Sequence, residues 1–192
     1  MEKLNAELCN TLGNLLNRVV GKNLNPQQHF PIPSVEAFRQ FENSHLQSLV
    51  DSLISLPTNV DDYFSSLRID RGVDSIMAVL RQANQLLHSA RPWKMDAETE
   101  ADQIKVVLYS TMETIRVCGI LLQPIVPNLA GKMLDVINVD KNHRSWIELF
   151  DNRRPFHRVT PNENSEMFTL SLGDIPLRIA AHQLPLYPRL RL

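Results

Sequence analysis

Apolar residues recur at every third or fourth position along most of the chain as far as Ile137. That spacing places apolar side chains on one face of an α-helix, so it predicts amphipathic helices. The first predicted helix extends to about Leu24 and is followed by a loop rich in proline. Its apolar face comprises Leu4, Leu8, Leu12, Leu15 and Val19.

The helices after the first are separated by prolines and by residues that cap helices. Proline disfavours helical geometry at the residue before it, and Ser, Thr, Asn and Asp side chains accept hydrogen bonds from the free N–H groups at a helix start. Ser34 fits as the N-cap of a second helix, and Pro92 ends a fourth. These signals predict helices over about 35–56, from Thr58 or Asn59 to Leu67, over 70–91, over about 97–122, and over about 128–137.

The order of these elements predicts the fold class. Five to six helices with no strands alternating between them indicate an all-α fold, a helical bundle, which we expect to fill residues 1–150. From residue 151 onward the periodicity degrades, and short apolar runs such as LPLYPRLRL (184–192) are separated by polar residues. We therefore expect residues 151–192 to form an irregular, extended tail that packs on a surface outside this chain.

Composition and charge limit the functions that this bundle can have. The 192 residues are 43% hydrophobic and 21% charged, which is typical of a globular protein. Twenty basic and 21 acidic residues give a net charge of −1, so the chain lacks the overall positive field that drives nonspecific binding to nucleic acids. Recognition of RNA would have to be local. No glycine belongs to a GxGxxG or GxxxxGK[ST] loop, which excludes dinucleotide-binding and P-loop sites of those types.

The two cysteines and the hydropathy pattern bear on the compartment. Cys9 and Cys118 lie inside apolar helical patterns, so we expect buried free thiols rather than a disulfide or a metal pair, and hence a reducing compartment. No apolar stretch approaches the ~20 residues that a membrane span needs. No signal or transit segment is recognisable, so we expect no targeting signal and no membrane partner.

The polar face of the first helix has an unusual composition. It carries Asn10, Asn14, Asn17 and Arg18 where a solvated helix commonly shows Lys and Glu. Carboxamide and guanidinium groups are the side chains that read the edges of unpaired RNA bases. On these residues alone, a plain solvated face is the more common interpretation, because an exposed face needs no ligand.

Other pairs of chemically active residues predict no catalytic or metal site. Glu42 and His45 form a single Glu-x-x-His, whereas a di-iron bundle uses two such pairs and two further carboxylates. Asp61 and Asp62 stand at the start of a short predicted helix, where acidic side chains interact favourably with the helix dipole.

Four separated motifs give the chain a family resemblance. They are NTLGNLLNR (10–18), the segment 53–95 that ends in a Pro-Trp pair and Lys-Met, the Pro-x-x-Pro turn between helices in 113–137, and the closing SWIELF (145–150) and LPLYPRL (184–190). In this order they resemble the helical anticodon-binding domain of class I methionyl-tRNA synthetases, and the short closing segment is most similar to the mitochondrial type.

The resemblance implies a partner and a set of contact residues. In this family an Asn and an Arg four residues apart on the first helix, and a Trp after the Pro that ends a later helix, meet the CAU anticodon of tRNA(Met). The matching positions are Asn14, Arg18 and Trp93, with Asn10 and Asn17 as additional candidates for facing RNA. A Trp just past a helix end is otherwise more often a hydrophobic cap than a stacking platform.

The resemblance also implies what this chain lacks. The HIGH-type and KMSKS-type signatures of the family's catalytic domain do not occur in it. We therefore expect no adenylate formation and no cofactor here, with ATP and magnesium belonging to the catalytic domain, on which the 151–192 tail would pack. The parent would be an ATP-dependent ligase of the mitochondrial matrix, and we expect this chain to be monomeric. The alternatives are a free-standing tRNA-binding protein that acts in trans and a helical scaffold without RNA contacts.

Overall fold

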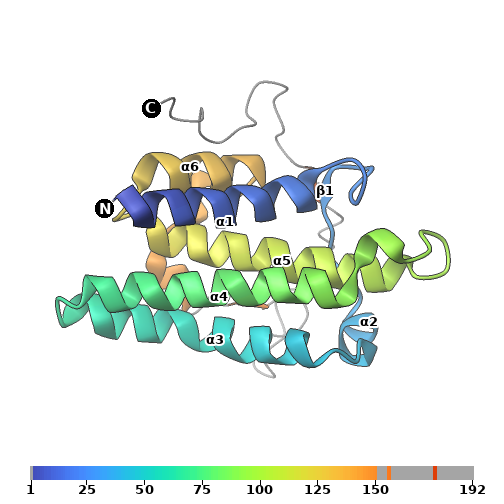
Figure 1. Cartoon of the computed structure of the whole chain (residues 1–192), viewed down its shortest axis with the longest axis horizontal. Coiled ribbons are helices and arrows are strands. Elements are labelled where there is room, and N and C mark those ends of the chain that lie inside the picture. The colour runs from blue at the N-terminus through green and yellow to red at the C-terminus, as the bar shows by residue number, and fades with distance from the viewer. Residues whose placement is uncertain (1, 151–154, 157–174, 177–192) are drawn as a thin grey trace.

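The protein is a helical bundle, seen in a computed structural model that describes the backbone of residues 2–150, 155–156 and 175–176 (Figure 1). Side chains are described for residues 11–150 and 155–156. The helices are α1 (Glu2–Val20), α2 (Val35–Gln40), α3 (Ser44–Ser65), α4 (Ile69–Ala90), α5 (Ala101–Leu122) and α6 (Pro127–Val136). The described part also contains three 3₁₀ turns, η1 (Pro92–Lys94), η2 (Lys141–His143) and η3 (Trp146–Leu149). It contains two short strands, β1 (His29–Phe30) and β2 (Ile175–Pro176). The predicted all-α fold is confirmed.

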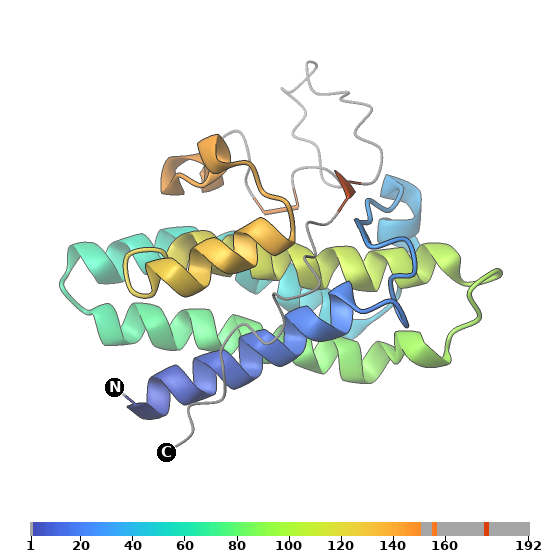
Figure 2. The same cartoon turned by 90° about the horizontal axis from the view of Figure 1, so that it is seen from above.

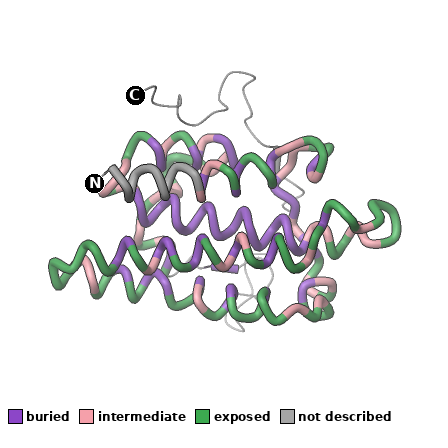
Figure 3. The backbone as a smooth tube through the Cα atoms, viewed as in Figure 1, coloured by how far each residue is buried: buried purple, intermediate pink, exposed green. Residues whose placement is uncertain are grey.

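Helix α5 lies at the centre of the bundle. It contacts α1, α2, α3, α4 and α6, and α3, α4 and α5 run side by side in both views (Figures 1 and 2). Every residue from Val106 to Leu122 is buried (Figure 3). Its buried hydroxyls bond within the helix: those of Ser110 and Thr111 donate to the carbonyl oxygens of Val106 and Val107 at 2.8 and 2.9 Å. Because this part of α5 is buried on every side, its apolar residues surround the helix and are not confined to one face.

An ion pair is buried inside this central helix. The Arg116 guanidinium donates from Nη2 and Nε to the Glu113 carboxylate at 2.7 and 2.9 Å. The backbone N–H of Phe156 donates to the same carboxylate at 3.1 Å. Burial by itself lowers the pKa of Arg116, but the adjacent Glu113 carboxylate outweighs that effect and raises the pKa, so the guanidinium stays charged. The sequence analysis did not predict this pair.

The predicted second helix is wrong in its extent. Helix α2 ends at Gln40, and α3 begins after Asn43, whose side chain accepts hydrogen bonds from the N–H groups of His45 and Leu46 at 2.9 and 3.3 Å. This N-cap satisfies N–H groups that a continuous helix would have bonded to its own carbonyls, so it starts a new helix. Helix α3 then continues through the buried Pro57 and absorbs the predicted short segment after it.

The other predicted helices differ from the structure at two boundaries. Helix α1 ends at Val20 rather than at about Leu24, because the Leu24 N–H donates to the Gly21 carbonyl at 3.1 Å instead of continuing the helical bonds. Helix α4 ends before Pro92 and α6 spans Pro127–Val136, as expected. Helix α5 begins at Ala101, four residues later than predicted from the pattern, because the Asp96 carboxylate accepts hydrogen bonds from the N–H groups of Glu98 and Thr99 at 3.0 and 2.8 Å. These bonds hold residues 96–99 in a turn.

Only small parts of the predicted tail over 151–192 are described. Phe156 is fully buried and packs on Phe38 and Tyr109, with ring centroids 5.5 and 6.1 Å apart. Strand β2 pairs antiparallel with β1. These described pieces contact the bundle itself, and the prediction for the rest of the tail lies outside the described residues.

Two further expectations concern single features. Cys118 is a buried free thiol, as predicted, and burial raises its pKa. The Cys9 side chain lies outside the described residues. Among the residues that the structure describes, no helix is both long enough and apolar enough to cross a membrane.

Candidate nucleic-acid interface

Helix α1 presents its carboxamides and its guanidinium outward. Its inner face is buried through Leu12, Leu15, Leu16, Val19 and Val20. Because a helix turns about 100° per residue, the residues between these positions point away from the bundle. The exposed set comprises Asn14, Asn17 and Arg18. Asn14 and Arg18 stand one turn apart on this face, whereas the Asn10 side chain lies outside the described residues.

The end of helix α4 meets this face of α1. His88, in the last turn of α4, places its Nε2 atom 3.4 Å from Nη1 of Arg18. The His88 ring also meets the Trp93 indole edge to face, with ring centroids 6.3 Å apart and an interplanar angle of 85°. The three side chains therefore form one continuous exposed group, which we call the Arg18–His88–Trp93 cluster.

The backbone after α4 determines where Trp93 lies. Arg91 adopts the left-handed conformation, with φ of 50° and ψ of 54°, and its N–H donates to the Leu87 carbonyl at 3.1 Å. This closes the helix, and Pro92 then opens η1, whose fixed φ suits a first helical position. The sharp turn leaves Pro92 buried and Trp93 on the surface.

Trp93 differs from the other tryptophan in its surroundings. Its side chain is 48% exposed, which is unusual for so large an apolar group. Trp146, by contrast, donates from Nε1 to the Ile120 carbonyl at 2.9 Å and packs on Phe64 with ring centroids 5.4 Å apart. Trp146 therefore stabilises the bundle, whereas part of the Trp93 indole is free to meet a ligand.

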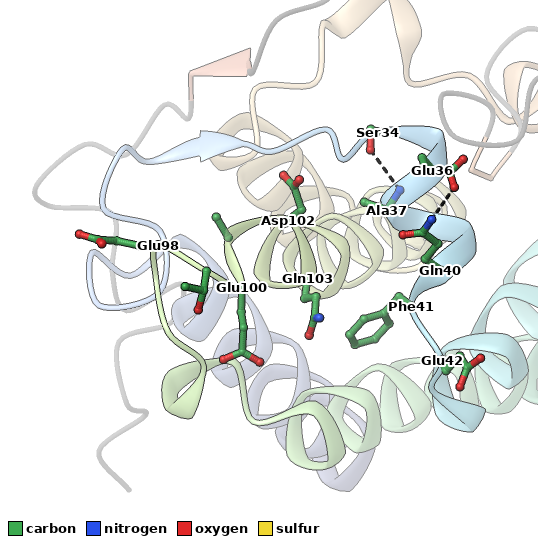
Figure 4. A pocket seen from close by; sticks show the side chains of 12 residues that line it. Ser34, Glu36, Ala37, Gln40, Phe41, Glu42, Glu98, Glu100, Asp102 and Gln103 are labelled. Carbon is green, nitrogen blue, oxygen red and sulfur yellow. Dashed lines mark hydrogen bonds between the residues drawn. The ribbon is translucent and has the colours of Figure 1, made fainter.

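Charge divides the surroundings of the cluster into two sides. On one side Arg91 and Lys94 flank Trp93 in the sequence, and both are exposed, as is Arg18. The other side is formed by the 95–100 turn itself together with α2 and the start of α5, which border a hollow of 610 Å³ (Figure 4). Its acidic lining residues are Glu36, Glu42, Glu98, Glu100 and Asp102. A phosphate backbone is attracted to the first side and repelled by the second.

The 95–100 turn is held by the Asp96 carboxylate. Hydrogen bonds from the Thr99 backbone N–H, the Thr99 hydroxyl and the Glu98 N–H hold the pKa of Asp96 below its usual range. The backbone N–H of Asp96 in turn donates to Glu100 at 2.8 Å. This turn connects η1, which carries Trp93, to the fixed central helix α5.

The structure brings together two of the residues predicted from the sequence. Arg18 and Trp93 lie on either side of His88, and Asn14 continues the same face of α1. His88 is not predicted from the sequence, since it is 70 positions from Arg18 and no spacing rule connects the two. The one available signal is that His88 falls in the last turn of the helix that leads to Trp93. Within the described ranges, no group of three or more His, Cys, Asp or Glu side chains could hold a metal ion.

Comparison with known proteins identifies relatives of one kind. Residues 32–166 match the model of a family described as the anticodon binding domain of methionyl tRNA ligase. The mitochondrial methionine–tRNA ligase of Homo sapiens is 33% identical over 180 residues, and the match covers 85% of this chain and 30% of that protein. The methionine–tRNA ligase of Mycobacterium leprae is 31% identical over 150 residues, covering 75% of this chain and 26% of its own length.

Solved structures support the same relationship. The methionyl-tRNA synthetase of Mycobacterium tuberculosis in complex with methionyl-adenylate matches with a TM-score of 0.66 and 27% sequence identity, over 77% of this chain and 29% of that one. The chain thus spans less than a third of the relatives that it matches. The family model covers Trp93 and His88 but begins after α1, which carries Asn14 and Arg18. Since that model matches more than half of the sequence, the chain belongs to the family of methionyl-tRNA ligase anticodon-binding domains.

Proposed function

We propose that this chain binds the anticodon loop of tRNA(Met), as the recognition part of a methionyl-tRNA synthetase. The observation that carries the proposal is the Arg18–His88–Trp93 cluster, which joins a guanidinium and a half-exposed indole on one surface. The family relationship supports anticodon loops as the ligand class.

Each contact residue has a chemical role in this proposal. The bases of an anticodon loop are unpaired, so their Watson–Crick edges are open to side chains and their faces are open to aromatic rings. Asn14 and Arg18 supply amide and guanidinium groups that distinguish bases by their edges. Trp93 supplies a plane on which one base stacks without strong preference for its identity. Asn17, which is also exposed on α1, and Asn10 are further candidates for this surface.

The charge distribution supports one direction of approach. The RNA backbone would pass along the side of Arg18, Arg91 and Lys94 and away from the acidic hollow. The proposed RNA side carries Arg18, Arg91 and Lys94, and the chain has a net charge of −1. Because so few cations would release few counterions from the RNA, the binding should depend only moderately on salt. Specificity would then rest mainly on contacts with the bases.

The chemistry of aminoacylation would lie outside this chain. The relatives are more than three times as long as the matched region, and the HIGH-type and KMSKS-type signatures are absent from this sequence. We therefore assign ATP, magnesium and adenylate formation to a catalytic domain that is connected to this domain or supplied as a partner. Residues 155–156 and 175–176 of the tail contact the bundle, and the remainder of 151–192 would pack on that domain. The chain itself would be monomeric.

The mitochondrial matrix is the compartment that we propose. The mitochondrial enzymes of Homo sapiens and Xenopus laevis, at 33% and 35% identity, support it. Bacterial ligases are also similar, at 31% identity. The proposed compartment therefore rests on the mitochondrial relatives and not on the residues of the anticodon surface.

Binding to anticodon stem-loops tests the proposal. The full chain is titrated with a stem-loop that carries CAU and with matched stem-loops in which one anticodon base is changed. We expect a preference for CAU of about five- to 150-fold per changed base, because one lost edge contact costs about 1–3 kcal/mol. Equal affinity for all triplets would refute anticodon recognition. Absence of binding would favour the alternative of a structural scaffold.

A further inference from the structure

His88 stands between the two side chains that we assign to the anticodon. Its Nε2 atom lies 3.4 Å from the Arg18 guanidinium, and its ring contacts the Trp93 indole edge to face. It is exposed, so the bundle gains little from its burial. An exposed side chain that contacts two ligand-facing groups at once is well placed to orient them.

The chemistry of the Arg18 contact defines the role of the His88 Nε2 atom. A guanidinium has only hydrogen-bond donors and stays charged, so the Nε2 atom of His88 must act as the acceptor. The contact uses one N–H group on Nη1 of Arg18 and leaves the other guanidinium N–H groups available to donate to a base edge.

The Trp93 contact is of a different kind. An edge-to-face pair at 6.3 Å and 85° uses the quadrupoles of the two rings and resists rotation of the indole. Trp93 stands on the three-residue turn η1, and its 48% exposure shows that packing in the bundle covers only about half of its surface. Preorganisation of this kind lowers the entropy that must be lost when a ligand binds.

We infer that His88 is a positioning residue for anticodon reading, which holds the Arg18 guanidinium through Nε2 and the Trp93 plane through its ring. The inference rests on the proposed function of this surface. It assigns His88 no direct contact with a base. It adds that the two recognition groups are coupled, so that the loss of His88 weakens the selectivity of Arg18 as well as the affinity supplied by Trp93.

Three substitutions of His88 separate its two contacts. His88→Ala removes both, His88→Gln keeps an acceptor for Arg18, and His88→Phe keeps a ring for Trp93. The matched control is His45→Ala, an exposed histidine near the start of α3 whose side chain is outside the cluster. Every variant is measured for melting temperature and for affinity toward the CAU stem-loop and a stem-loop with a changed triplet.

We expect His88→Ala to lower the affinity for CAU by about three- to tenfold, the worth of one hydrogen bond, with a smaller effect on the changed triplet. His88→Gln should recover most of the preference for CAU, whereas His88→Phe should recover affinity but not preference. In the Arg18→Ala background, His88→Ala should lower CAU affinity less than it does in the wild type, since part of its effect passes through Arg18.

Other outcomes overturn the inference in distinguishable ways. If the wild type prefers CAU and His88→Ala behaves like His45→Ala, His88 positions nothing. The same conclusion follows if His88→Ala lowers the melting temperature and weakens both stem-loops alike, or if its effect is undiminished in the Arg18→Ala background. If the wild type itself does not prefer CAU, the proposed function fails, and the role of His88 fails with it.

Discussion

Replacement of Trp93 by alanine tests the stacking role most sharply. One base stacked on an aromatic ring is worth about 1–3 kcal/mol, so Trp93→Ala should weaken binding to the CAU stem-loop by roughly five- to 150-fold. Because edge contacts rather than stacking specify the base, the loss should be similar for CAU and for loops with a changed triplet.

The same substitution should have a limited effect on stability. Trp93 is 48% exposed, so about 130 Å² of the roughly 250 Å² of a tryptophan is buried, which at ~25 cal/mol per Å² gives an upper limit of about 3 kcal/mol. In a domain of this size, each kcal/mol lowers the melting temperature by about 2–4 °C. We therefore expect Trp93→Ala to remain folded at 25 °C, with a melting temperature lower by no more than about 12 °C.

Trp146→Ala is the matched control for this experiment. It removes the hydrogen bond to Ile120 and the packing on Phe64, so it should destabilise the bundle by about 3 kcal/mol or more. Its folded fraction should still bind the CAU loop like the wild type. The reasoning is refuted if folded Trp93→Ala binds the loop with unchanged affinity, or if the two variants lose stability and affinity in the same proportion.

Four further predictions concern other parts of the molecule. Asn14→Ala and Arg18→Ala should each weaken CAU binding by about 1–3 kcal/mol and relax selectivity, as measured against changed triplets, whereas Arg39→Ala, an exposed arginine on α2, should do neither. Glu113→Ala removes the carboxylate that pairs with the buried Arg116 guanidinium and should lower stability by about 3–5 kcal/mol in denaturant titrations. The Asp96 carboxylate should titrate by NMR below its usual range; since its folded pKa is depressed, its contribution to stability is present above the unfolded pKa and is lost as the pH falls through the folded pKa. The purified chain should show no methionine-dependent exchange between ATP and pyrophosphate above a heat-killed control. Measurable exchange would contradict the expectation that a chain without the HIGH-type and KMSKS-type signatures forms no adenylate.

The hydrophobic periodicity was sufficient to predict most helices, but not the break between α2 and α3. Phe41 and Leu46 both fit one continuous helical face, so the pattern carries no interruption. What decides the break is the Asn43 side chain bonding to two backbone N–H groups. A polar residue at such a position occurs in many helices, so the sequence alone does not distinguish a cap from a surface asparagine.

Contacts between distant residues account for the remaining differences. Glu113 and Arg116, three positions apart, have the spacing of a surface ion pair, and only the helices around α5 together with Phe156 make the pair buried. Arg18 and Trp93 could be selected from the sequence through the family resemblance. The contact of both residues with His88 could not be predicted from the sequence, because it depends on how α1 packs against α4.

The central claim is that the exposed face of Trp93 meets the anticodon loop, and the two tryptophans of the chain allow a direct measurement. Each indole N–H gives its own NMR signal, and that of Trp146 is an internal reference because it is bonded to the Ile120 carbonyl. On addition of the CAU stem-loop, the Trp93 signal should shift while the Trp146 signal stays in place. A Trp93 signal that does not move at saturating RNA, or equal shifts of both signals, would contradict the account.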